Sequence, residues 1–351
     1  ATIFIFLCTI PLFIFSANIM VVKGTSSVAA SERNYANYVF NFMELCLKKY
    51  GVSFVTTDDE NMRKFLNKDV DIIIFPYNSV LSHDQRESIK SFFQNKGNVL
   101  VCYSEDTVLA EMMGLKLGAY KKSEKYGQWS VMRFNIKAPP GTPSFVWNET
   151  RNIRPVYPSD NNGTIIAYWE DSNGNLSSDP AVVRTQKGFW FTHVLSPSGD
   201  TLSKEQMLTA FIGEINAGLG NAIAKAMFNG LKNSDYAADV MHYFSAKNKE
   251  NKENKELAEV YSSLMDIESR INSALKKENY ADAINLVPEY HNLMFMASAL
   301  MQEKRKGEFI GVWDHLSIGL YPGEWDKTCL LYTSDAADDL LCVDLGGRRI
   351  I

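Results

Sequence analysis

The sequence predicts an α/β protein built on a parallel sheet, with antiparallel strands added to the sheet and a helical arm after it. Three observations support this prediction. Apolar strands alternate with amphipathic helices up to Ser104, strand patterns with Trp, Tyr, Pro and Gly fill the stretch from Gly114 to Leu195, and helical spacing dominates from Leu202 to Lys306.

The first elements alternate between strand and helix. "IMVVKG", from Ile19, is an apolar strand, and "VSFVTT", from Val52, is the next one. Between them we expect a helix from Ser31 to Lys49, with one apolar side. That side is predicted to carry Tyr35, Tyr38, Phe42 and Leu45, whereas Cys46 is expected to be a small buried hydrophobic residue.

The alternation continues as far as "NVLVCYS". A short helix is expected at 61–66, followed by the near-continuous apolar strand "VDIIIFP". Ser82 should open a helix that stops at Gly97. Such repeated strand and helix units predict a parallel sheet covered on both faces.

The middle of the chain has the pattern of antiparallel strands. "QWSVMRFNI", "GTIIAYWED" and "AVVRTQKGFWFTHVL" are expected strands, the last one folded back at Gln186, Lys187 and Gly188. In "LAEVYSSLMDIESRINSAL", apolar residues recur every three or four positions, which predicts an amphipathic helix of a bundle or arm. The expected units are therefore an α/β domain at 18–219 and a helical arm at 220–306.

Composition and charge exclude several classes of protein. A hydrophobic fraction of 46% among 351 residues is enough for well-filled cores, so disorder is excluded. The formal charge of -5, with both signs interspersed, gives no basic surface for nucleic acid. No spacing of Cys or His predicts a metal site, and no glycine-rich loop predicts a nucleotide, so no cofactor is expected.

The first 17 residues have the character of an export signal. "ATIFIFLCTIPLFIFSAN" is an apolar run of signal-peptide length that ends in the small residues Ser16 and Ala17. We therefore expect an exported bacterial protein, periplasmic, secreted or associated with the cell envelope, with no stable transmembrane segment once the signal is removed. The alternative is that this run is a buried first strand.

One candidate catalytic pair lies at strand ends. Cys102 and His193 follow strands whose carboxyl ends are expected at the site-bearing edge of the sheet, where they would serve as nucleophile and base. A nucleophile elbow requires a sharp turn, usually with glycines two residues away, and Leu100 and Ser104 stand there instead. A buried structural role for both residues is the alternative.

Tryptophans are candidates for sugar contact. Trp129, Trp169 and Trp190 lie in the strand-rich stretch, where their rings would either stack on sugar rings or fill the core.

Two segments carry resemblances to known families. "DIIIFPYNSVLSHDQRESIKSFFQNKGNVLVCYS" resembles the amidotransferase-like domains found in some β-galactosidases, which implies a flavodoxin-like sheet without a working elbow. "GVWDH…GLYPGEWDKT" resembles the first strand and loop of the family 10 glycosylhydrolase-like proteins, which implies the start of a TIM-type barrel at 307–331. By this resemblance Asp314 and His315 would face the sugar site at the carboxyl end of the strand, and Trp313 would contact substrate.

The residues after that segment fit no element of such a barrel. "TSDAADDLLCVDLGGRRII", within 332–351, resembles translated sequencing adapter, so we expect a non-native tail. The alternative is a real acidic tail.

The expected function is that of an accessory region. The resemblance implies an exported glycoside hydrolase-like parent that binds polysaccharide or envelope glycan through its barrel. Paired carboxylates from different strands are required for glycoside cleavage, so we expect this chain by itself to be inactive. The alternative functions are a non-catalytic glycan-binding module and an oligomerisation module, as a homo-oligomer.

Overall fold

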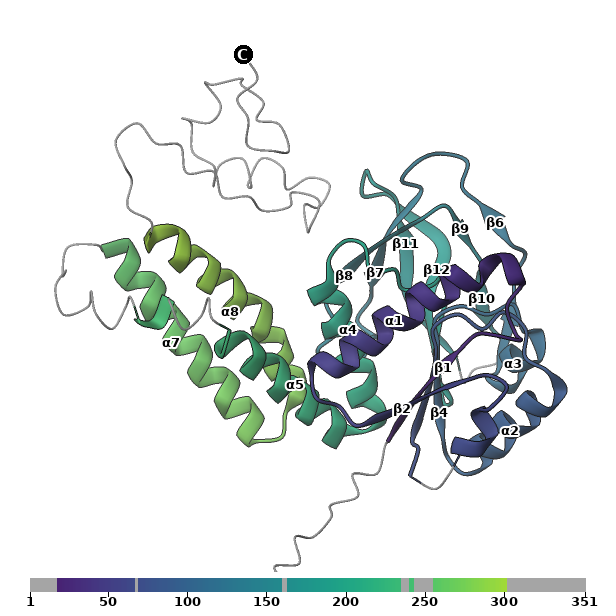
Figure 1. The fold of residues 1–351 in the computed structure, drawn as a ribbon. Helices are drawn as coiled ribbons and strands as arrows, with labels where there is room; N and C mark the ends of the chain where they lie inside the picture. Colours follow the sequence, from purple (N-terminus) through teal and green to yellow (C-terminus); the bar gives the residue numbers. More distant parts are fainter. Residues whose placement is uncertain (1–17, 67–68, 160–162, 235–239, 243–254, 302–351) are drawn as a thin grey trace, which may run out of the picture.

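The computed structural model describes residues 18–66, 69–159, 163–234, 240–242 and 255–301. Within them, one mixed sheet has the strand order β2-β1-β3-β4-β13-β12-β11-β7-β8 (Figure 1). Its strands are β1 (Ile19–Lys23), β2 (Phe54–Asp58), β3 (Ile72–Phe75), β4 (Asn98–Val101), β7 (Trp129–Phe134), β8 (Phe145–Thr150), β11 (Thr164–Glu170), β12 (Leu176–Thr185) and β13 (Gly188–Phe191). Two small sheets pair β10 (Val156–Pro158) with β5 (Leu115–Leu117) and β6 (Lys121–Lys122) with β9 (Asn152–Ile153).

The sheet has a parallel half and an antiparallel half. β2, β1, β3, β4 and β13 are parallel neighbours, and from β13 outward every pairing is antiparallel. The prediction of a parallel sheet with added antiparallel strands is confirmed. Because parallel strands end at one edge, the loops after β1, β3, β4 and β13 meet there.

Helices cover both faces of the parallel half, as the alternating pattern predicts. α1 (Arg33–Lys49) and α4 (Thr201–Ile215) share one core cluster with Ile72, Ile74 and Leu100. α2 (His83–Gln94) and α3 (Thr107–Met112) share the other with Ile73 and Val101. Side chains of a strand alternate between faces, which is why neighbouring residues of β3 belong to different clusters.

The start of α2 follows from two side chains. The Ser82 hydroxyl accepts a hydrogen bond from the backbone N–H of Gln85, and the Gln85 side chain accepts one from the backbone N–H of Ser82. This capping box satisfies donors that the first helical turn leaves free. The prediction that Ser82 opens this helix is confirmed.

The predicted apolar side of α1 is confirmed at Phe42 and wrong at its other three residues. Its buried face consists of Ala36, Val39, Phe40, Phe42, Met43, Cys46 and Leu47. Tyr35, Tyr38 and Leu45 are 42%, 53% and 65% exposed. Tyr35 and Tyr38 therefore mark a surface of the helix, while Cys46 is buried as expected.

The turn between β12 and β13 requires a glycine. Gly188 has a φ of 119°, and a Cβ at this position would lie 2.1 Å from the carbonyl oxygen of Val99 on β4. Only glycine permits both this backbone conformation and this close approach. The turn predicted at 186–188 is confirmed, and it brings β13 beside β4.

The helical arm consists of α5 (Ala217–Lys232), α7 (Lys255–Lys276) and α8 (Tyr280–Met301), and it extends to one side of the sheet domain (Figure 1). α7 packs along α8, and α5 packs against α8. The predicted spacing of α7 is confirmed by the burial of Leu257, Val260, Leu264, Ile267 and Ile271.

The arm joins the domain through close backbone contacts. A Cβ at Gly213 of α4 or at Gly220 of α5 would lie 2.5 Å and 2.6 Å from its nearest atom, and the Tyr280 ring fills the space beside both. Small residues at these positions allow α4, α5 and the start of α8 to converge. Among the helices that the structure describes, none is long and apolar enough to cross a membrane.

Candidate functional site

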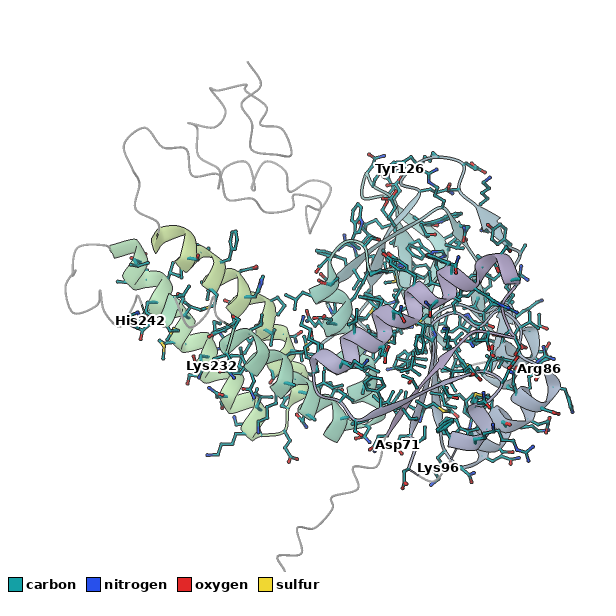
Figure 2. The ribbon with its side chains drawn as sticks, viewed as in Figure 1. Asp71, Arg86, Lys96, Tyr126, Lys232 and His242 are labelled. Atoms are coloured by element: carbon teal, nitrogen blue, oxygen red, sulfur yellow. The ribbon has the colours of Figure 1, made fainter. Side chains whose placement is uncertain are left out.

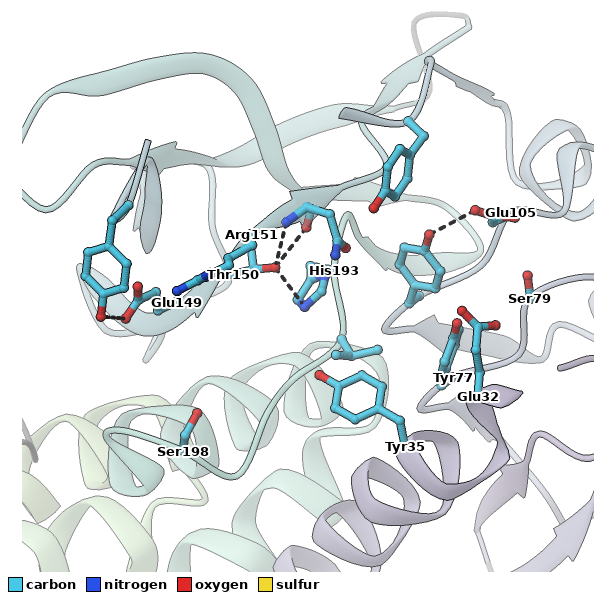
Figure 3. A pocket seen from close by; sticks show the side chains of 15 residues that line it. Glu32, Tyr35, Tyr77, Ser79, Glu105, Glu149, Thr150, Arg151, His193 and Ser198 are labelled. Atoms are coloured by element: carbon cyan, nitrogen blue, oxygen red, sulfur yellow. Dashed lines mark hydrogen bonds between the residues drawn. The ribbon is translucent and has the colours of Figure 1, made fainter. Parts of the chain in front are cut away.

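The main cavity opens at the edge where the parallel strands end. It has a volume of about 840 Å³ and is lined by side chains that follow β3, β4 and β13, by the start of α1, and by the β8–β9 turn (Figure 3). Figure 2 shows Tyr126, part of its lining, at the end of the domain opposite to Asp71 and Lys96, which precede β3 and β4. Open α/β sheets bind ligands at this edge, so the cavity is the candidate site.

A row of aromatic rings forms one side of the cavity. The ring centroids of Tyr35 and Tyr77 are 6.2 Å apart, those of Tyr77 and Tyr103 are 5.2 Å apart, and those of Tyr103 and His193 are 6.2 Å apart. Successive rings meet edge to face, with interplanar angles of 73°, 73° and 70°. Tyr77 and Tyr103 are each 7% exposed and pack in a core cluster with Ala36 and Val39 of α1, so Tyr35, which is 42% exposed, offers the accessible face of this row.

Carboxylates accompany three of the tyrosines. The Tyr103 hydroxyl donates to Glu105 at 3.0 Å, and the Tyr126 hydroxyl donates to Glu149 at 3.3 Å. Burial, then a hydrogen bond to the Glu32 carboxylate, raises the pKa of Tyr77.

The pKa of Tyr103 is also raised, first by burial and then by the charge of Glu105 and the hydrogen bond to it. Tyr77 and Tyr103 therefore stay protonated at neutral pH and act as donors, while the carboxylates act as acceptors.

His193 is held by the β8–β9 turn. Its Nε2 lies 3.0 Å from the Thr150 hydroxyl oxygen, and its Nδ1 is buried without a hydrogen-bond partner. Burial lowers the pKa of His193 to about 4, so the ring is neutral at pH 7. A catalytic base needs a third group that orients it, and no described residue performs this role at Nδ1. The Thr150 hydroxyl itself donates to the Asn152 carbonyl oxygen at 2.9 Å, so the His193 Nε2 is the donor to Thr150 and the pair is a structural contact.

Arg151 supplies the positive charge in the cavity lining. Its guanidinium lies over the Tyr126 ring, with 5.6 Å between the Cζ atom and the ring centroid. Stacked in this way, the guanidinium keeps donors available for a ligand.

The loop after β1 lies at the same edge and holds an internal carboxylate. Backbone N–H groups and hydroxyls of Thr25, Ser26 and Ser27 all donate to the two oxygens of Asp59. Burial opposes ionisation, but these hydrogen bonds outweigh it and lower the pKa of Asp59 to about 2. Gly24 permits this loop, because a Cβ there would lie 2.2 Å from the carbonyl oxygen of Tyr77.

The structure does not bring Cys102 and His193 together as a nucleophile and a base. Cys102 is fully buried in the core cluster shared with α1, on the same face as Leu100, whereas His193 lines the cavity. Burial raises the pKa of the Cys102 thiol to about 12, which is the reverse of what activates a nucleophile. The catalytic prediction for Cys102 is wrong because the alternation of β4 directs Tyr103, not Cys102, to the cavity.

The tryptophans predicted to contact sugar lie in the core. Trp129, Trp169 and Trp190 are 1%, 0% and 0% exposed, and the Nε1 of Trp169 donates to the Thr192 hydroxyl at 2.8 Å. A ring without exposed surface cannot stack on a sugar, so this prediction is wrong and the core alternative describes all three. Trp313, Asp314 and His315 lie outside the described residues.

The sequence interpretation missed the tyrosines of the cavity. Tyr77 and Tyr103 each come directly after the loop-facing end of a parallel strand, in "FPYNS" and "VCYSE". The rule that sites gather at carboxyl ends could have found them. Within the described residues, no group of three His, Cys, Asp or Glu side chains is arranged to hold a metal ion.

Comparisons with known proteins identify no family. No protein-family model and no curated protein matches the chain. Among solved structures, the chain is similar to a cold-adapted β-galactosidase from Rahnella sp. R3, with 14% identity over 57% of this chain and 31% of that one, and a TM-score of 0.42. It is also similar to an α-L-fucosidase isoenzyme from Paenibacillus thiaminolyticus, with 13% identity over 57% of this chain and 33% of that one, and a TM-score of 0.41.

A third similar structure is a ThuA-like protein from Bacteroides uniformis, with 12% identity, 57% of this chain and 92% of that chain covered, and a TM-score of 0.44. The chain thus spans about a third of the length of the two glycosidases. At these scores no activity or site residue is transferred from any of the three proteins.

Proposed function

We propose that the described part of this chain is a non-catalytic glycan-binding region of an exported glycoside hydrolase-like protein. The observation that carries the proposal is the cavity at the carboxyl edge, with Tyr35, Tyr77, Tyr103, Tyr120 and Tyr126 in its lining. Sugar rings bind on aromatic faces, and their hydroxyls pair with carboxylates, amides and guanidinium groups. The hydrolase part of the proposal is supported by the resemblance of "GVWDH…GLYPGEWDKT", which lies outside the described residues.

The absence of paired catalytic groups among the described residues supports a non-catalytic role. The thiol near the edge is buried, and His193 has a hydroxyl partner but no orienting group. Glu105 and Glu149 are each bonded to a tyrosine hydroxyl, an arrangement suited to fixed acceptors. Incubating the 351-residue chain with polysaccharide should release no reducing sugar above a blank.

Binding to the cavity is tested with exposed tyrosines, which can be replaced without disturbing the core. Tyr35 and Tyr126 line the cavity and are 42% and 72% exposed, whereas Tyr157 is 37% exposed and lies outside the lining. Calorimetry of the full chain with a panel of oligosaccharides should identify a ligand. Tyr35→Ala and Tyr126→Ala should each weaken its binding by about fivefold, since a stacked ring contributes about 1 kcal/mol.

The control variant Tyr157→Ala should bind the same ligand as the parent chain does. All three variants should unfold at the parent's urea midpoint, which separates lost contact from lost structure. The proposal fails if no oligosaccharide in the panel binds. It also fails if the two cavity variants bind as tightly as Tyr157→Ala.

A further inference from the structure

The charges of the cavity are divided between two walls. One wall, here called the acidic wall, carries Glu32, Glu105, Tyr35, Tyr77 and Tyr103 from the start of α1 and from the loops after β3 and β4. The facing wall carries Glu149, Thr150 and Arg151, and Figure 3 shows Glu149 and Arg151 on the side opposite to Glu32 and Glu105, with His193 between the two groups. The two walls therefore favour different parts of a ligand.

The acidic wall is negative without a neutralising partner in the lining. Among the described residues, no Lys or Arg forms an ion pair with Glu32 or Glu105. Arg151 lies on the facing wall over Tyr126. The charge of Arg154 acts on the Tyr103 hydroxyl, but Arg154 is outside the lining. His193 is neutral at pH 7, because burial lowers its pKa to about 4.

Aromatic faces add to the attraction for a cation. A protonated amine is drawn to the face of an aromatic ring as well as to a carboxylate. Of the three tyrosines on this wall, Tyr35 is 42% exposed and can offer its face, whereas Tyr77 and Tyr103 are buried and position Glu32 and Glu105 through their hydroxyls. Two carboxylates with one accessible ring, that of Tyr35, therefore stand together where an ammonium group could bind.

We propose that the acidic wall binds a protonated amine, and that the ligand of this cavity is a glycan containing sugars with free amino groups. The inference rests on the proposed glycan-binding function and names the class of glycan. The facing wall, with Arg151 and Asn152, supplies donors for the hydroxyls of the same sugar or its neighbour. An N-acetylated sugar has the same ring and hydroxyls but no charge, so it lacks the electrostatic attraction to Glu32 and Glu105.

The test compares a glucosamine oligosaccharide with its fully N-acetylated counterpart, by calorimetry on the full chain at pH 6. At this pH the amines are charged and His193 is still neutral. The glucosamine oligomer should bind about tenfold tighter at low salt, and raising the salt to about 0.5 M should remove most of this advantage. Glu32→Gln and Glu105→Gln should each reduce the preference while leaving the N-acetylated oligomer's affinity unchanged.

Two further variants test whether the preference for the amine comes from the acidic wall. Glu149→Gln changes a carboxylate of the facing wall, and Glu111→Gln changes an exposed carboxylate of α3 outside the lining. Both should retain the preference for the amine. Equal loss in all four variants would overturn the inference, since it would mean that overall charge attracts the oligomer.

The failures of the two proposals are distinguishable. If both oligomers bind with equal affinity and Tyr35→Ala weakens both, the glycan-binding proposal stands and the amine inference is wrong. If neither oligomer nor any other sugar binds, the glycan-binding proposal itself is wrong.

Discussion

The side chains of Cys102 and Tyr103, adjacent residues that follow β4, have different surroundings. Cys102 is buried in the core beneath α1, and the hydroxyl of Tyr103 donates to Glu105 in the cavity. The two-residue period of the strand accounts for this division. The cavity lining therefore contains the tyrosine of this pair and not the thiol.

Cys102 should resist alkylation in the folded protein. Its thiol is fully buried and its pKa is raised to about 12, and Cys46 is in the same condition. Treatment with iodoacetamide at pH 8, followed by peptide mass mapping, should find neither residue modified, while both react in urea. Modification of Cys102 but not Cys46 in the folded chain would contradict the structure.

Acidification should destabilise the fold through His193. Its folded pKa is about 4, below the ordinary 6.5, so between these values the unfolded chain binds more protons than the folded one. The free energy of unfolding contributed by this group is complete above pH 6.5 and falls as the pH is lowered toward 4. At pH 5 the loss should be about 2 kcal/mol.

The variant His193→Gln isolates this effect, because glutamine can still bond to Thr150 but does not titrate. Urea unfolding of both proteins at pH 7 and pH 5 should show a smaller loss of stability in the variant. An equal loss in both proteins would mean that other groups cause the acid sensitivity.

Replacing Trp169 should cost stability without acting on a ligand. The side chain is fully buried and donates to Thr192, so Trp169→Ala leaves a void and removes one donor from the Thr192 hydroxyl, which still donates to the Pro180 carbonyl oxygen. We expect a loss of about 3 to 5 kcal/mol in the free energy of unfolding, measured in urea. Trp147→Ala, at a half-buried position on β8, is the control and should cost less. A Trp169 variant with parental stability would show that this ring is not part of the core.

Asp59 should be one of the most sensitive charged positions in the domain. Asp59→Ala leaves the donors of Thr25, Ser26 and Ser27 without their acceptor, at a cost of about 3 kcal/mol in the free energy of unfolding. Asp59→Asn should cost less, because one oxygen remains, and the exposed neighbour Glu60→Ala should be close to neutral.

Asp59 should affect the stability of the fold in a lower pH range than His193 does. Its folded pKa, about 2, is below the ordinary 3.8, so its contribution is complete above pH 3.8 and is lost as the pH falls toward 2. The difference in the free energy of unfolding between the parent chain and Asp59→Ala, measured in urea, should be smaller at pH 2.5 than at pH 4. An equal difference at both pH values would contradict the lowered pKa of Asp59.

The sequence predicts the sheet well because its strands are locally distinct. "IMVVKG", "VDIIIFP" and "NVLVCYS" are short, apolar and bounded by turn residues, so their pairing as parallel strands follows from the helices between them. The buried face of α1 is less predictable. Its aromatic residues Tyr35 and Tyr38 satisfy the helical spacing, yet they face the cavity side and solvent.

Apart from Tyr77 and Tyr103, the lining of the candidate site was beyond prediction because it depends on contacts between distant segments. Glu32, Glu105 and Arg151 come from three separate loops, and none of them belongs to a motif. His193 was correctly singled out as a strand-end residue, but its partner is Thr150, which lies 43 positions earlier in the chain. Only the pairing of β13 with β4 brings these groups to one edge.

The carboxylate of Asp59 occupies the loop where parallel α/β sheets commonly hold a phosphate, at the end of their first strand. The loop therefore contains its own anion as a permanent part of the chain. A nucleotide arriving there would meet a negative charge and donors already in use. Asp59 therefore takes the place of a bound anion after β1. The tyrosine cavity remains the candidate ligand site at this edge of the sheet.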